Sequence, residues 1–154
     1  MTEAPEKSSK SAAPQSPAVA APVYPANGLT VERVYTTADV HPYDEVTWER
    51  RDIVMTNWRD GSVNFEQRGV EFPDFWSVNA ANIVTTKYFR GAVGSDVREW
   101  SLRQLIDRVV RTYRTAGEQS GYFASAADAD VFEHELTWML LHQVFSSKIG
   151  RAHV

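Results

Sequence analysis

The residues best suited to chemistry are two histidines near the C-terminal end of the chain, His134 and His142, with His41 far upstream. Glu133 and Glu135 flank His134, and imidazoles beside carboxylates are common metal ligands. However, His134 and His142 lie two helical turns apart, whereas helical metal motifs pair ligands three or four positions apart. We therefore predict no metal site, and we interpret this stretch as a solvated acidic helix face.

Two further groups of charged residues could act on a substrate. Carboxylates suited to acid/base catalysis stand at Glu66, Glu71 and Asp74, but nothing in their spacing fixes a geometry between them. Arginines that could bind phosphate recur at Arg103, Arg108, Arg111 and Arg114. The alternative for these arginines, which we favour, is a solvated basic face opposite an apolar stripe. We assign no catalytic, cofactor-binding or metal-binding residue.

Composition excludes several classes of protein. The chain has 154 residues, a net charge of -4 and no cysteine, which excludes a disulfide scaffold, a cysteine-ligated zinc site and a cysteine nucleophile. The mildly acidic balance argues against a nucleic-acid partner. No apolar run is long enough to span a membrane. We expect a soluble, cytoplasmic protein without a nucleic-acid or membrane partner.

The N-terminal half predicts a tail, a strand and a hairpin. Residues 1–28 are rich in Ala, Pro and Ser, which predicts a disordered tail. The alternation in "LTVERVYTT" (29–37) predicts a short strand. Two β-rich stretches, 51–58 and 62–70, flank Asp60-Gly61, a dipeptide typical of tight turns. They predict a β-hairpin.

Three helices are predicted in the C-terminal half. Ser77 can cap a helix running to about Phe89, after which "GAVG" (91–94) breaks the chain. Ser101 and Gln104 form a capping box for a second helix that Gly117 should end. Ser125 should cap the third. The apolar stripes of the last two helices are Leu102, Leu105, Ile106, Val109, Val110 and Tyr113, and Phe132, Leu136, Met139, Leu140 and Val144. The fold class is α+β, a hairpin followed by a small helical bundle.

Aromatic rings are dense between Arg68 and Gly91, and the last helix becomes strongly apolar over 138–145. Some of these rings should form an interface, although a local core is an equally good interpretation for Phe72 and Trp76. Something should also pack over Trp138 to Phe145. The residues that follow neither cap nor solubilise this helix, so we expect an incomplete chain.

Three stretches resemble, in order and spacing, the N-terminal region of adenosylcobalamin-dependent (class II) ribonucleotide reductases. They are "DVHPYDEVTWERRDIVMTNWRDGSVNFEQRGVEFPDFWSVNAANIVTTKYFRG", "SLRQLIDRVVRTYRTAG" and "GYFASAADADVFEHELTWMLLHQVFS". The resemblance covers 31–146, and it assigns 29–146 to the N-terminal domain of that family. In the full-length family this region packs on a ten-stranded α/β barrel.

The resemblance implies a vitamin B12-dependent ribonucleoside-diphosphate reductase, which makes deoxyribonucleotides for DNA synthesis by a thiyl-radical mechanism. It implies adenosylcobalamin as cofactor, a ribonucleotide substrate, deoxynucleotide effectors and a thioredoxin-type reductant, and it is compatible with a homodimeric parent. The resemblance stops after "LLHQVFS", where the chain reads "SKIGRAHV". This ending resembles translated sequencing adapter, so we expect residues 147–154 to be non-native. Because the family's catalytic cysteines lie further on, we predict that this chain alone is inactive. The alternative is a stand-alone protein-interaction module without catalysis.

Overall fold

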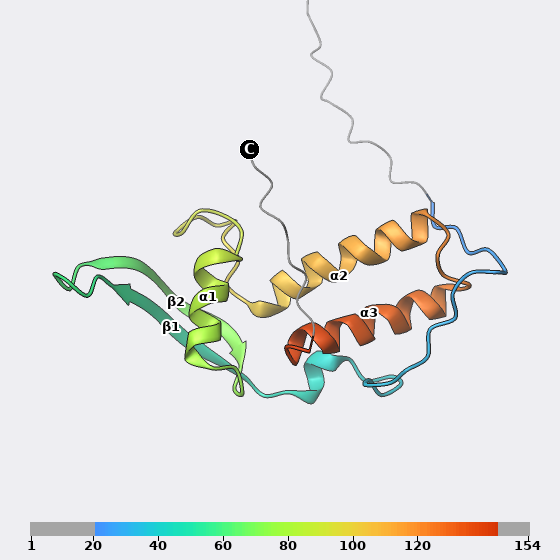
Figure 1. Ribbon diagram of the computed structural model, residues 1–154, viewed down its shortest axis with the longest axis horizontal. Coiled ribbons are helices and arrows are strands. Elements are labelled where there is room, and N and C mark those ends of the chain that lie inside the picture. The colour runs from blue at the N-terminus through green and yellow to red at the C-terminus, as the bar shows by residue number, and fades with distance from the viewer. Residues whose placement is uncertain (1–20, 145–154) are drawn as a thin grey trace, which may run out of the picture.

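The computed structural model describes residues 21–144 as a β-hairpin and three helices (Figure 1). The elements are a 3-10 turn η1 (Pro42–Glu45), β1 (Trp48–Thr56), β2 (Val63–Pro73), α1 (Val78–Lys87), α2 (Leu102–Gln119) and α3 (Ala126–Leu141). The predicted α+β class is therefore confirmed. Most of the predicted tail and all of the residues predicted to be non-native, 147–154, lie outside the described residues.

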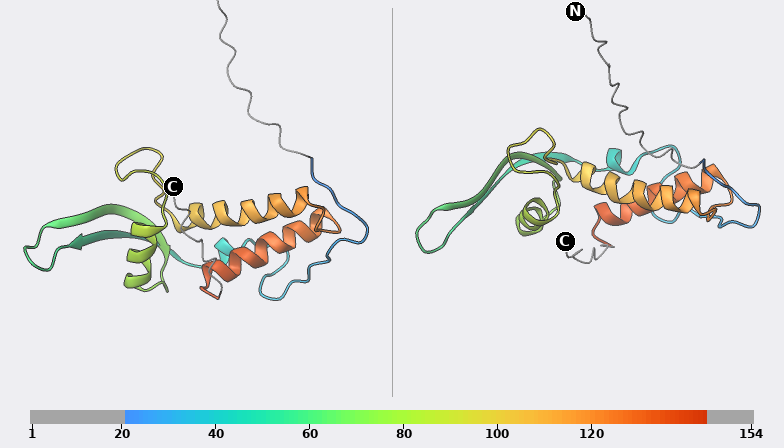
Figure 2. Two further views of the ribbon diagram at one scale, coloured as in Figure 1. Left: turned by 45° about the horizontal axis from the view of Figure 1, so that its top comes forward. Right: turned by 90° about the horizontal axis from the view of Figure 1, so that it is seen from above.

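The hairpin forms where the sequence predicts it, and both strands are longer than expected. Gly61 adopts a left-handed backbone with φ 71°, and the turn closes with a bond of 2.7 Å from the Asn57 amide to the Ser62 carbonyl. The strands pair antiparallel from Trp48 opposite Pro73 to Thr56 opposite Val63. A register shift beside Gly69, which has φ 64°, marks a bulge. The turn of the hairpin lies far from α2 and α3 (Figure 2).

The core joins the base of the hairpin to all three helices. Its largest fully buried side chains include Phe72 on β2, Leu102 and Ile106 on α2, and Leu141 on α3. The helices begin at their predicted caps: Ser77, Ser101 and Ser125 each accept a hydrogen bond from the first turn, and the capping box of Ser101 and Gln104 is present. Local capping signals thus set where each helix starts.

The strand predicted over 29–37 is wrong. This segment belongs to a strap, residues 29–41, that runs along α3 without a strand partner beyond one isolated bridge between Leu29 and Phe123. Its amides bond to side chains instead: the Val31 amide donates to Asp128 Oδ1 at 2.9 Å, and the Thr36 amide donates to Glu135 Oε1 at 2.9 Å. Alternation of apolar and polar residues indicates an extended backbone. The backbone amides and carbonyls of an extended segment can form hydrogen bonds with side chains as well as with a neighbouring strand.

The prediction that Gly117 ends its helix is also wrong, because α2 continues to Gln119. Gly117 is buried, and a Cβ atom at this position would lie 2.6 Å from Cε2 of the Phe123 ring. The glycine is therefore required by the close packing of Phe123 against the helix rather than by a turn. The left-handed residue after the helix is Gly121, with φ 65°.

We expect Gly117→Ala to lower the free energy of unfolding by about 1 to 3 kcal/mol, because the added methyl group would force the Phe123 ring out of its place. In an unconstrained helix the same change is stabilising by about 1 kcal/mol. The measurement is urea unfolding of both chains. Gln119→Ala, at an exposed position of the same helix, is the control and should change little; a stabilised Gly117→Ala chain would contradict the packing argument.

Candidate functional site

The aromatic-rich segment divides into core and surface. Phe72, Trp76 and Phe89 are buried, with ring centroids of Phe72 5.6 Å from Trp76 and 5.8 Å from Phe89. Phe75 and Tyr88 each remain 48% exposed. Phe72 and Trp76 therefore belong to the local core, and Phe75 and Tyr88 are the rings available to a partner.

Four stacked rings connect the turn before α1, the end of α3 and the strap. Phe75 lies 5.3 Å from the His142 ring, His142 lies 4.0 Å from Trp138, and Trp138 lies 4.5 Å from Tyr35, with interplanar angles of 16°, 19° and 6°. His142 is also the C-cap of α3, and its Nδ1 lies 3.0 Å from the Trp138 carbonyl. The strap and Phe75 thus cover part of the apolar end of α3 that the sequence left without a partner.

Beside this column, α1 presents apolar side chains to solvent. Val78 and Ile83 on α1 are 69% and 48% exposed, and Phe75, in the turn before α1, is 48% exposed, whereas Ala81 and Thr85 of α1 are buried. We call Phe75, Val78 and Ile83 the outer α1 face. Exposed apolar side chains within one short segment make that segment a candidate interaction site.

Two arginines hold this surface in place. Arg51 donates from Nη1 to the Trp76 carbonyl at 2.6 Å and from Nη2 to the Pro73 and Asp74 carbonyls, which fixes the turn before α1. Arg98 donates to the Thr85, Phe89 and Gly91 carbonyls and so satisfies the C-terminal end of α1. Burial lowers the pKa of the Arg98 guanidinium. Arg51 lies on β1 and Arg98 in a loop, and a single arginine gives no sequence pattern, so neither role could be predicted.

The carboxylates considered as an acid/base pair have separate structural partners. Glu71 accepts a bond of 2.7 Å from the Ser101 hydroxyl and lies 3.2 Å from Arg103 Nε, whereas Glu66 pairs with Arg68 at 2.6 Å. Asp74 is exposed at the end of β2, where its amide donates to the Thr47 carbonyl. This arrangement offers no acid/base pair.

The interpretation of the α2 arginines as a solvated face is wrong for Arg108 and Arg114, as it is for Arg103, which is half-buried beside Glu71. Arg108 pairs with Glu99 at 2.8 Å, and Arg114 contacts Glu118, Asp130 and Glu133. Burial would raise the pKa of Glu99, but bonds from Arg108 and the Arg90 amide outweigh it, and the pKa falls. These pairs tie α2 to the preceding loop and to α3, so the two arginines are already occupied.

The acidic stretch around His134 is likewise bonded rather than solvated. Glu133 pairs with Arg114, and Glu135, only 7% exposed, accepts bonds from the strap. Burial would raise the pKa of Glu135, but hydrogen bonds from Thr36 and from the Tyr35 amide outweigh this effect and lower the pKa. His134 lies beside His41, with ring centroids 5.2 Å apart. Within residues 21–144, no group of three or more metal-ligating side chains is close enough to hold an ion.

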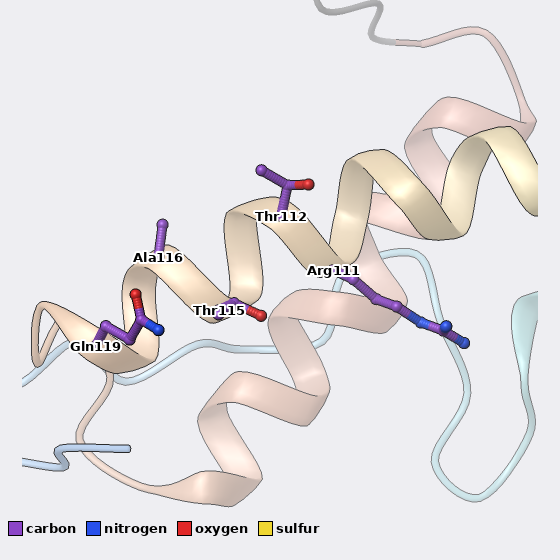
Figure 3. Close-up of a pocket in the computed structure, with 5 residues that line it drawn as sticks. All are labelled: Arg111, Thr112, Thr115, Ala116 and Gln119. Atoms are coloured by element: carbon purple, nitrogen blue, oxygen red, sulfur yellow. The ribbon is translucent and has the colours of Figure 1, made fainter. Parts of the chain in front are cut away.

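A groove on the surface of α2 is too open to enclose a large cofactor. This shallow groove is lined by Arg111, Thr112, Thr115, Ala116 and Gln119, all on the outer surface of α2 (Figure 3). Nothing encloses a ligand from the opposite side, so a corrinoid finds no site there. Among the helices of residues 21–144, none has the length and apolar character that a bilayer span requires.

Comparison with known proteins identifies the relatives of this chain. A family model described as class II vitamin B12-dependent ribonucleotide reductase matches residues 50–143. A vitamin B12-dependent ribonucleotide reductase of Streptomyces coelicolor is 77% identical over 119 residues, and that of Streptomyces clavuligerus is 76% identical over 119 residues. The protein of the same name from Rhodopirellula baltica is 41% identical over 118 residues. These matches cover 75–77% of this chain but only 11–12% of the length of the relatives.

Proposed function

This chain belongs to the class II vitamin B12-dependent ribonucleotide reductases, and from that membership we propose that it is an N-terminal part of such a reductase, with a structural and docking role. The observation that carries the proposal is the outer α1 face, three exposed apolar side chains in a segment whose two ends are bonded by Arg51 and Arg98. Its partner is the remainder of the reductase, including the catalytic barrel.

The position of the end of α3 supports this partner. His142, at the C-cap of α3, stacks on Phe75, and the Trp76 Nε1 donates to the Leu141 carbonyl at 2.8 Å. The chain therefore leaves α3 beside the outer α1 face. In relatives about eight times as long as the aligned segment, the sequence that follows would begin at this surface.

The activity of the whole reductase would be reduction of ribonucleoside diphosphates to deoxyribonucleotides, with thiols recycled by a thioredoxin-type reductant. Adenosylcobalamin would supply the radical when bound in the whole reductase. The 154 residues include no cysteine, so they provide neither the thiyl radical nor the reducing thiols. What these residues contribute is an ordered surface on which the remainder of the protein is positioned.

We predict that the isolated chain gives no deoxynucleotide from a ribonucleoside diphosphate, adenosylcobalamin and a dithiol. A chimaera in which residues 29–144 replace the matching region of the Streptomyces coelicolor reductase should retain turnover. In that chimaera, Phe75→Asp with Val78→Asp should lower turnover at least about tenfold, since each charge would be buried without a partner.

The control is Thr112→Asp with Thr115→Asp, which adds the same charge to the exposed outer surface of α2 and should leave turnover unchanged. Circular dichroism of both double variants in the isolated chain separates loss of docking from loss of folding. Turnover by the isolated chain, or full activity of the Phe75/Val78 variant, would refute the proposal.

A further inference from the structure

Three basic side chains meet where the strap crosses α3. Arg33 Nη1 lies 3.3 Å from His134 Nδ1 and 2.8 Å from the Thr36 hydroxyl, and the His41 and His134 rings are in edge contact. A guanidinium can only donate, so His134 Nδ1 must be the unprotonated acceptor. His41 Nδ1 accepts a bond of 3.2 Å from the Tyr43 amide, which also requires an unprotonated nitrogen. The bond between Arg33 and His134 in the docked strap therefore requires the His134 imidazole to be neutral.

The acids around His134 form their hydrogen bonds and ion pairs with other residues. On α3, Asp130 and Glu133 both pair with Arg114 of α2, and Glu135 accepts its bonds from Tyr35 and Thr36. On η1, Asp44 and Glu45 are exposed, and Glu45 accepts a bond from the Thr37 hydroxyl. The groups that act on His134 from the strap, Arg33 and His41, are both basic.

We propose that the strap is a pH-operated latch: protonation of His134 as the pH falls breaks its bond with Arg33, brings like charges together, and releases the strap from α3. The latch is separate from the outer α1 face, and it does not depend on the docking role proposed above.

The electrostatics agree with this geometry. Burial lowers the pKa of His134, and the neighbouring His41 and Arg33 lower it further, more than Glu133 and Asp130 raise it. The released form binds a proton near the ordinary histidine pKa of 6.5, whereas the docked form binds it only at lower pH. Docking is therefore fully favoured above pH 6.5 and weakens as the pH falls from there towards the lower pKa of the docked form.

Release would change the surface of α3. Tyr35 covers one face of the Trp138 ring at a centroid distance of 4.5 Å, so opening of the strap uncovers that face. Glu135 stays ionised in this pH range, because its pKa lies below the ordinary value of 4.5. A transition between pH 7.5 and 5.5 would thus report on His134 rather than on Glu135.

The test is amide hydrogen exchange of Tyr35 and Thr36, followed by NMR on the 154-residue chain at pH 7.5 and 5.5 and expressed as protection relative to intrinsic rates. We expect the protection of these amides to be about tenfold lower at pH 5.5 than at pH 7.5. This is the effect expected when a locally opening segment loses one hydrogen bond to a charged group. His134→Asn retains an acceptor without a titrating group and should keep the strap protected at both pH values. Arg33→Gln removes one of the two basic neighbours and should reduce the drop.

Equal protection at both pH values in the parent chain would overturn the latch, as would an undiminished drop in His134→Asn. If His134→Asn fails to fold, titration of the His134 ring in the parent chain decides the question. A midpoint below 6.5 supports the latch, and a midpoint at or above 6.5 refutes it.

Discussion

Replacement of Trp76 by alanine is expected to lower the free energy of unfolding by about 3 to 5 kcal/mol, the range for removal of a buried aromatic side chain. Trp76 packs on Phe72 and donates its indole N–H to the Leu141 carbonyl at 2.8 Å, a bond between residues 65 positions apart. It therefore joins the base of the hairpin to the end of α3. Its removal leaves a cavity and an unpaired carbonyl in the same place.

Denaturant unfolding followed by circular dichroism measures this loss, with Trp58→Ala as the matched control. Trp58 lies beside the hairpin turn and is 86% exposed, so its removal should change stability by less than about 0.5 kcal/mol. Trp76→Phe retains most of the ring without the N–H and should cost an intermediate amount. Equal losses from the Trp76→Ala and Trp58→Ala changes would show that Trp76 does not join the two regions.

The second large effect is expected at Glu135. Its carboxylate accepts bonds from the Tyr35 amide at 3.0 Å and from the Thr36 amide and hydroxyl at 2.9 and 2.6 Å. Glu135→Ala should lower the free energy of unfolding by about 2 to 3 kcal/mol, because it leaves these donors without an acceptor in a largely buried place. Glu135→Gln keeps one acceptor oxygen and should cost less. Glu32→Ala, an exposed glutamate of the strap, is the control.

The contribution of Glu135 has a definite pH dependence. Because hydrogen bonds hold the pKa of the folded carboxyl below its ordinary value of 4.5, the unfolded chain binds the proton first as the pH falls. The stabilisation is present above about pH 4.5 and is lost as the pH falls through the lower pKa of the folded state. Unfolding of the parent chain and Glu135→Gln between pH 6 and pH 3 would show this: the parent should lose more stability, and parallel curves would contradict the assignment.

Short-range signals predicted much of the fold correctly. Asp60-Gly61 placed the hairpin, and the serines at 77, 101 and 125 placed the helix starts, because turns and caps are decided by residues a few positions apart. The errors at the strap and at Gly117 have one cause. Phe123 packs against Gly117, and Glu135 bonds Thr36, from other parts of the chain. No local pattern in the sequence records either contact.

The candidate surface was also only partly predictable from the sequence. Ring density between Arg68 and Gly91 predicted that aromatic side chains would serve both core and interface, and the structure assigns Phe72, Trp76 and Phe89 to the core. The column from Phe75 through His142 and Trp138 to Tyr35 was not predictable, because its rings come from three separate segments. The pairing of Arg108 and Arg114 with acids on other elements was missed for the same reason.

The strap also limits the order in which this region can fold during synthesis on the ribosome. Thr36 is synthesised early, but its acceptor Glu135 follows 99 positions later. At a synthesis rate of about 5 to 20 residues per second, the strap waits roughly 5 to 20 s before α3 exists to receive it. During that interval the hairpin and α2 can form from neighbouring residues, while the strap has no native partner. A segment that is translated before the hairpin and the helices is thus among the last to find its place.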